Sequence, residues 1–173
     1  MASKAVVPKP GAFKVGDRAV HPSHGVGMII GIELRDIGGT KHEFYILETT
    51  DRGRKNKVMV ATESAERHGL RKTISPKDAI KVYEVLRTKE TAVKAQPWNR
   101  RQREYSQMLN SGSPFEVAKV LRDLYRVKGS KELSVGERRL LEQALALVVA
   151  ELAIAQKSDA AAIEQEIATI FAS

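Results

Sequence analysis

The order of hydrophobic and polar positions divides the chain into two parts with different periods. Up to about residue 61, short segments rich in β-branched and aromatic residues alternate with turn-forming sequences, a pattern typical of antiparallel strands. Between the second and third segments, Gly38 and Gly39 can adopt the positive φ angles that a tight hairpin requires. The segments are 18–22, 26–34, 43–49 and 57–61. They predict a small antiparallel barrel or strongly bent sheet.

After Pro76 the period becomes helical. In 75–78, 113–116 and 134–137 a serine stands three residues before an acidic residue, which is the capping-box pattern of a helix start or a near variant of it. The first two also place proline at the first helical position, where its missing N–H costs nothing. Apolar residues then recur at intervals of three and four, and Asp159 is a candidate start for a last short helix. We expect about five helices packed as a bundle.

These two parts predict an α+β protein with two domains. We place the β domain at residues 13–70 and the helical domain at residues 71–173, with the boundary in the turn-rich stretch before Pro76. Residues 1–12 have no periodic pattern and are expected to form a disordered tail.

The formal net charge of +8 is unevenly distributed. Lysine and arginine dominate residues 87–139, whereas residues 140–173 hold one lysine and five acidic residues. A basic middle followed by an acidic end indicates a patch that faces a polyanion. A solvated charged surface explains the same composition, and composition alone does not decide between the two.

Other compositional features favour a cytoplasmic protein without membrane contact. The chain has no cysteine, which excludes disulfides and thiolate metal sites. No apolar run approaches the roughly 20 residues that span a bilayer. The first residues also lack the apolar core of a secretory signal.

No motif indicates catalysis, a metal or a cofactor. Gly25, Gly27 and Gly31 approach a dinucleotide fingerprint, but they lead into a strand and not into the helix that would hold a pyrophosphate. His21 and His24 have ligand spacing, yet no third ligand follows at a usual spacing, so we interpret them as turn residues. We expect a protein that is not an enzyme and that needs neither metal nor cofactor.

The only tryptophan, Trp98, stands in the most basic short stretch of the chain. It follows a proline that could open a helix, and Arg100, Arg101 and Arg103 come directly after it. One interpretation is that Trp98 covers the core beside Tyr105. The other is an aromatic wedge between base pairs, with the arginines on the phosphates. The residues alone leave both open.

Four motifs together resemble the CarD/CdnL family of bacterial transcription regulators. They are "FKVGDRAVHPSHGVG" (13–27), "WNRRQREY" (98–105), "VAKVLRDLY" (117–125) and "LSVGERRLLEQA" (133–144). The resemblance runs from about Phe13 to the end of the chain. The first motif is less specific, because transcription-repair coupling factors share that domain.

The resemblance implies a Tudor-like amino-terminal domain that binds the β subunit of RNA polymerase, in the holoenzyme with its primary sigma factor. Arg35 matches a family arginine at this interface, and Met59 stands where members have arginine or methionine. Ala61 departs from the proline that often follows this strand.

The resemblance further implies a carboxy-terminal domain that binds DNA at the upstream edge of the transcription bubble. Trp98 would be the minor-groove wedge, and the basic residues would hold the backbone without reading sequence. Val127 stands near the position where some members have arginine, so the DNA contact is assigned to the next residue, Lys128. The basic residues are Arg100, Arg101, Arg103, Arg138, its neighbour Arg139, and Lys128.

The function implied is stabilisation of open promoter complexes, including those at ribosomal RNA promoters, by a nucleoid-associated monomer. The alternative is a stand-alone architectural or RNA-binding protein in which the β domain is a second nucleic-acid surface.

Overall fold

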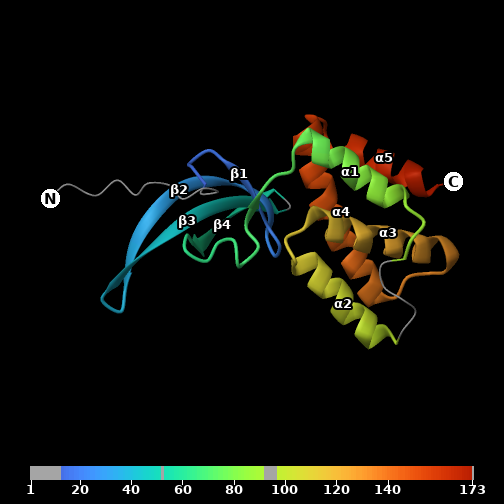
Figure 1. The fold of residues 1–173 in the computed structure, drawn as a ribbon, viewed down its shortest axis with the longest axis horizontal. Helices are drawn as coiled ribbons and strands as arrows, with labels where there is room; N and C mark the ends of the chain where they lie inside the picture. The colour runs from blue at the N-terminus through green and yellow to red at the C-terminus, as the bar shows by residue number, and fades with distance from the viewer. Residues whose placement is uncertain (1–12, 52, 92–96, 173) are drawn as a thin grey trace.

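In the computed structural model, residues 13–51, 53–91 and 97–172 are described. Within them, five strands precede five helices, so the predicted α+β fold is confirmed (Figure 1). The tail expected at residues 1–12 lies outside the described residues. The elements are β1 (Arg18–His21), β2 (Gly25–Ile37), β3 (Thr40–Asp51), β4 (Arg54–Ala61), β5 (Arg71–Lys72), α1 (Pro76–Arg87), α2 (Trp98–Asn110), α3 (Pro114–Ser130), α4 (Val135–Gln156) and α5 (Ala160–Phe171).

The strands form one antiparallel sheet in the order β4-β3-β2-β1-β5. Gly38 and Gly39 close the β2–β3 hairpin with φ angles of 61° and 83°, as predicted. Along β2, β1 pairs with Gly25–Met28 only, so among the described strands the distal part of β2 is bonded on its β3 side alone. This long hairpin is the arm that extends from the sheet in Figure 1.

A register shift between Ile29 and Gly31 bends β2 over a small core. Ile29 and Leu47 are fully buried there, and Phe13 meets the Tyr45 ring edge-on with centroids 5.6 Å apart. The bend and the enclosed core match the strongly bent sheet that the sequence predicts.

The helix starts follow the predicted caps. Ser75, Ser113 and Ser134 each accept a hydrogen bond from the backbone N–H three residues on. Only Ser134 forms the reciprocal box, with its own N–H donating to Glu137 at 3.1 Å. Asp159 caps α5. The apolar faces of the helices meet in a second core, so the predicted bundle is present.

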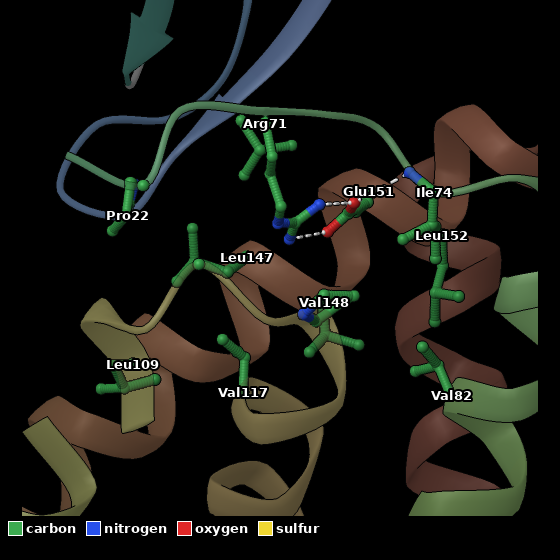
Figure 2. Close-up of a pocket in the computed structure, with 14 residues that line it drawn as sticks. Pro22, Arg71, Ile74, Val82, Leu109, Val117, Leu147, Val148, Glu151 and Leu152 are labelled. Atoms are coloured by element: carbon green, nitrogen blue, oxygen red, sulfur yellow. Dashed lines mark hydrogen bonds and ion pairs between the residues drawn. The ribbon is translucent and has the colours of Figure 1, made fainter. Parts of the chain in front are cut away.

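The sheet and the helices meet at an ion pair. Arg71 of β5 makes two hydrogen bonds to the Glu151 carboxylate of α4, one of them from Nη2 at 2.7 Å. The Ile74 N–H donates to the same carboxylate at 3.0 Å. Figure 2 shows these bonds beside a cavity of about 20 Å³ that is otherwise lined mainly by apolar side chains. The proposed boundary after residue 70 stays a prediction.

Within the part of the chain that the structure describes, none of the helices combines the length and the hydropathy needed to cross a membrane.

Candidate nucleic-acid interface

Trp98 is the first residue of α2, and its side chain is half-buried. Pro97 precedes it at the cap position, where α2 has no side-chain cap bond. The ring rests on the first turn of α4: a Cβ built on Gly136 would lie only 2.9 Å from Trp98 Cζ2 and 3.4 Å from Nε1. Because glycine has no side chain, the two helix starts can approach this closely. Trp98 therefore packs on the surface of the bundle.

Arg101 also contacts the Trp98 ring. Its guanidinium lies 5.0 Å from the centroid of the Trp98 ring, within cation–π range. The same group is 3.7 Å from the Glu137 carboxylate, and its side chain is only 19% exposed. Arg101 thus contacts both the Trp98 ring and Glu137 of α4, and so supports the ring. Its predicted contact with phosphate stays a prediction.

Glu137 is charged although it is buried. Burial raises the pKa of its carboxyl, but hydrogen bonding to the backbone and side chain of Ser134 lowers it, as do the charges of Lys131 and Arg101. The net result is a pKa below the ordinary value. One carboxylate therefore caps α4, attracts Lys131 at 3.9 Å and fixes the arginine under the ring.

Exposed cations stand on the same helix starts as the ring. The starts of α2 and α4 lie side by side at the end of the bundle away from the sheet (Figure 1). α2 contributes Arg100 and Arg103, and α4 contributes Arg138 and Arg139. We call Trp98 and these four exposed arginines the Trp98 patch. The structure thus places these four predicted arginines, exposed, on the two helix starts that meet at the ring.

Lys128 lies apart in its contacts. It is exposed in the last turn of α3, and its ammonium is 5.7 Å from the centroid of the Tyr125 ring. Lys131, three residues on, approaches Glu137, so the end of α3 still borders the start of α4. The sequence did not single out Lys131.

The two residues predicted to bind polymerase share one face of the sheet. Arg35 on β2 is opposite His42, and Met59 on β4 is opposite Ile46, two rows further along the same face. Both are exposed, and Arg35 makes an ion pair with Glu33 at 3.1 Å. Arg35 lies on the part of β2 that β1 does not cover. Ala61 is at the end of β4, opposite Phe44 on that face.

The histidines form a turn. The His21 and His24 rings are 4.8 Å apart, and the His21 Nδ1 accepts a hydrogen bond from the Ser23 N–H at 3.1 Å. Burial, together with the nearby His24 and His68, lowers the pKa of His21, which keeps the ring neutral. Among the described residues, no group of three or more potential ligands could hold a metal.

The sequence interpretation missed two residues of the site. Gly136 and Glu137 look like part of an ordinary capping motif, and their second role depends on contact with α2. One signal was available: glycine in the first turn of a long helix is unfavourable, so a close approach could have been suspected there.

Two family models match the chain. The model described as "CarD-like/TRCF RID domain" matches residues 13–74, and the one described as "CarD, C-terminal domain" matches residues 81–168. A protein of Bacillus subtilis (strain 168) with the name "Putative transcription factor YdeB" is 26% identical over 142 residues, which are 82% of this chain and 91% of that protein. The matched ranges include both Arg35 and the whole Trp98 patch.

Proposed function

Because the chain belongs to the CarD family of transcription regulators, we propose that it joins the β subunit of RNA polymerase to promoter DNA and stabilises the open complex. The sheet would bind the polymerase, and the Trp98 patch would bind DNA at the upstream edge of the bubble. The action would take place on the nucleoid in the cytoplasm, with the protein as a monomer.

One observation carries the DNA side of the proposal: the only tryptophan lies half-buried on the surface among exposed arginines. A ring in a closed core could not reach a base step, and a freely mobile ring would lose conformational entropy on insertion. Seated on Gly136 and held by Arg101, this ring is already ordered. Such a ring favours partial insertion in the minor groove, with the arginines on the phosphates.

Weak affinity for DNA is enough for this mechanism. Attachment to polymerase gives the patch a high local concentration near the promoter. The patch needs only to bind melted DNA better than closed duplex, and a difference of about 1.4 kcal/mol shifts that equilibrium tenfold. Promoters with short-lived open complexes, such as those for ribosomal RNA, would respond most.

The polymerase side would use the open part of β2. An extended segment of the β subunit can add to an uncovered strand through backbone hydrogen bonds. Arg35 and Met59 would contact the partner through the face that they share. The RID model matched by residues 13–74 describes a polymerase-interacting domain, which supports this assignment.

The test is Trp98→Ala. The variant should fold and bind polymerase like the wild type, since the ring is only partly buried and packs at the edge of the helical core. Open complexes should decay about tenfold faster after competitor challenge. Phe115→Ala is a matched control, because Phe115 is also a half-buried aromatic residue. It lies in the first turn of α3, at the opposite end of that helix from Lys128 and the start of α4. Equal protection by the Trp98→Ala variant and the wild type would contradict the wedge.

A second experiment separates the alternative of a stand-alone nucleic-acid-binding protein. We expect RNA polymerase to capture the protein after nuclease treatment, because the sheet binds protein and not nucleic acid. Loss of capture on nuclease treatment would favour the alternative.

A further inference from the structure

Val135 is an apolar side chain that stands in solvent beside the Trp98 patch. It is the first residue of α4 and is 75% exposed, the highest value among the large exposed hydrophobic residues of the described chain. The next residue, Gly136, is the seat of the Trp98 ring. Val135 is therefore the residue directly before the glycine that the Trp98 ring contacts.

The fold gives no reason for valine here. The start of α4 is fixed by the reciprocal bonds between Ser134 and Glu137, and neither bond involves the Val135 side chain. A β-branched residue also has a lower helix propensity than alanine. An exposed valine at this position adds little to stability.

Its position on α4 gives a reason instead. Residues three and four apart lie on the same face of a helix, so Val135 shares its face with Arg138 and Arg139. Both arginines are exposed. A surface that places Arg138 and Arg139 on phosphates would bring Val135 toward the groove between them.

We propose that Val135 is a second apolar contact of the wedge, beside Trp98, against sugars and base edges of minor-groove DNA. This inference rests on the proposed function and adds a residue to it. Apolar side chains insert at kinked or partly unstacked steps in the minor groove, where water is displaced. Two apolar groups, one from each of the helix starts that meet at Gly136, would cover more of an opened step than the indole alone.

The test compares Val135→Ala with Ile80→Ala. Ile80 on α1 is 61% exposed, and alanine is the better helix former at both positions, so neither variant should lose the fold. Val135→Ala should shorten the open-complex lifetime about three- to tenfold, as expected for losing up to two buried methyl groups. Ile80→Ala should leave the lifetime unchanged, and Val135→Ile should match or exceed the wild type.

Salt dependence distinguishes an apolar contact from a lost cation. Arg138→Ala should reduce the slope of log DNA affinity against log salt concentration by about 0.9. Val135→Ala should lower the affinity for DNA without changing that slope. A change in slope for Val135→Ala would overturn the apolar contact, because the substitution would then be acting through the arginines.

The outcomes separate this inference from the proposed function. If Trp98→Ala shortens the lifetime but Val135→Ala behaves like Ile80→Ala, the inference fails and the wedge stands. If neither Trp98→Ala nor Val135→Ala has an effect, both fail.

Discussion

At the residue scale, the site depends on a glycine. Alanine at Gly136 would favour α4 by about 1 kcal/mol if the space were free. It is not free, because a Cβ there would be 2.9 Å from the Trp98 ring. Close packing in the helix start thus sets where the ring lies.

Gly136→Ala should displace the ring without unfolding the protein. Since Trp98 is the only tryptophan, fluorescence excited at wavelengths that the four tyrosines do not absorb reports on this site alone. We expect an altered emission spectrum, a shorter open-complex lifetime, and a free energy of unfolding within about 1 kcal/mol of the wild type.

Gly129→Ala is the control for this change. Gly129 is also in a helix, but nothing lies within 4 Å of the Cβ that it would gain. This variant should show the helix propensity gain with an unchanged spectrum. The same spectrum for Gly136→Ala and the wild type would contradict the packing of the Trp98 ring on Gly136.

The sequence predicts some of these residue roles and not others. Pro97 predicts that Trp98 lies at a helix start, and the structure confirms it. The contact of Arg101 with Glu137 joins two helices with α3 between them along the chain. No local pattern carries such a pairing, because it depends on how the helices pack.

At the element scale, the start of α4 connects helix capping to the support of the ring. The pKa of Glu137 is lowered in the folded protein. Its negative charge therefore stabilises the fold at pH values above 4.5, the ordinary pKa of a glutamate. That contribution is lost as the pH falls through the folded-state pKa.

Glu137→Gln should remove this dependence. The amide oxygen can still accept from Ser134, but Arg101 and Lys131 lose their charge partner. We expect a lower free energy of unfolding near neutral pH and a shallower decline below about pH 4.5 than in the wild type. Denaturant unfolding across a pH series measures both, and parallel curves for the two proteins would contradict the role of the charge.

The sheet shows where hydrophobic patterning stops being informative. The four predicted strands are confirmed. β2 is longer than predicted, because it continues past residue 34 through Arg35 and Asp36. There its backbone pairs with β3 although no hydrophobic core lies beneath this part of the hairpin. β5 was missed: it has only Arg71 and Lys72, and no apolar alternation marks it.

This extension of β2 leads to a prediction about polymerase binding. Arg35→Glu should weaken binding to an isolated β-subunit fragment by about tenfold, since it reverses a charge at the proposed contact. Lys41→Glu is the matched control: Lys41 pairs with Asp36, on the opposite face of the same hairpin. Equal losses for the two variants would indicate general electrostatics and contradict a specific contact by Arg35.

At the scale of the whole molecule, the two parts must present their sites in one geometry. A wedge delivered by a tethered protein gains most when the link is stiff, because flexibility lowers the effective concentration at the DNA. The bonds of Glu151 to Arg71 and to the Ile74 N–H supply such a link (Figure 2). The sequence predicts two parts but not this docking, because Arg71 and Glu151 are 80 residues apart.

Glu151→Gln tests the link. Removing one charge of a buried pair costs about 3 kcal/mol of stability. Because this pair joins the sheet to the helices, we expect the loss to weaken the junction more than either core. We expect a shorter open-complex lifetime, although affinity for the β fragment and for DNA, each measured alone, stays at the wild-type value. An Arg71→Met/Glu151→Gln double variant should recover part of the lost stability and lifetime, because the glutamine amide oxygen can still accept from the Ile74 N–H and no guanidinium is left without its charge partner. If the single variant is destabilised but keeps the full lifetime, rigid docking is not part of the mechanism.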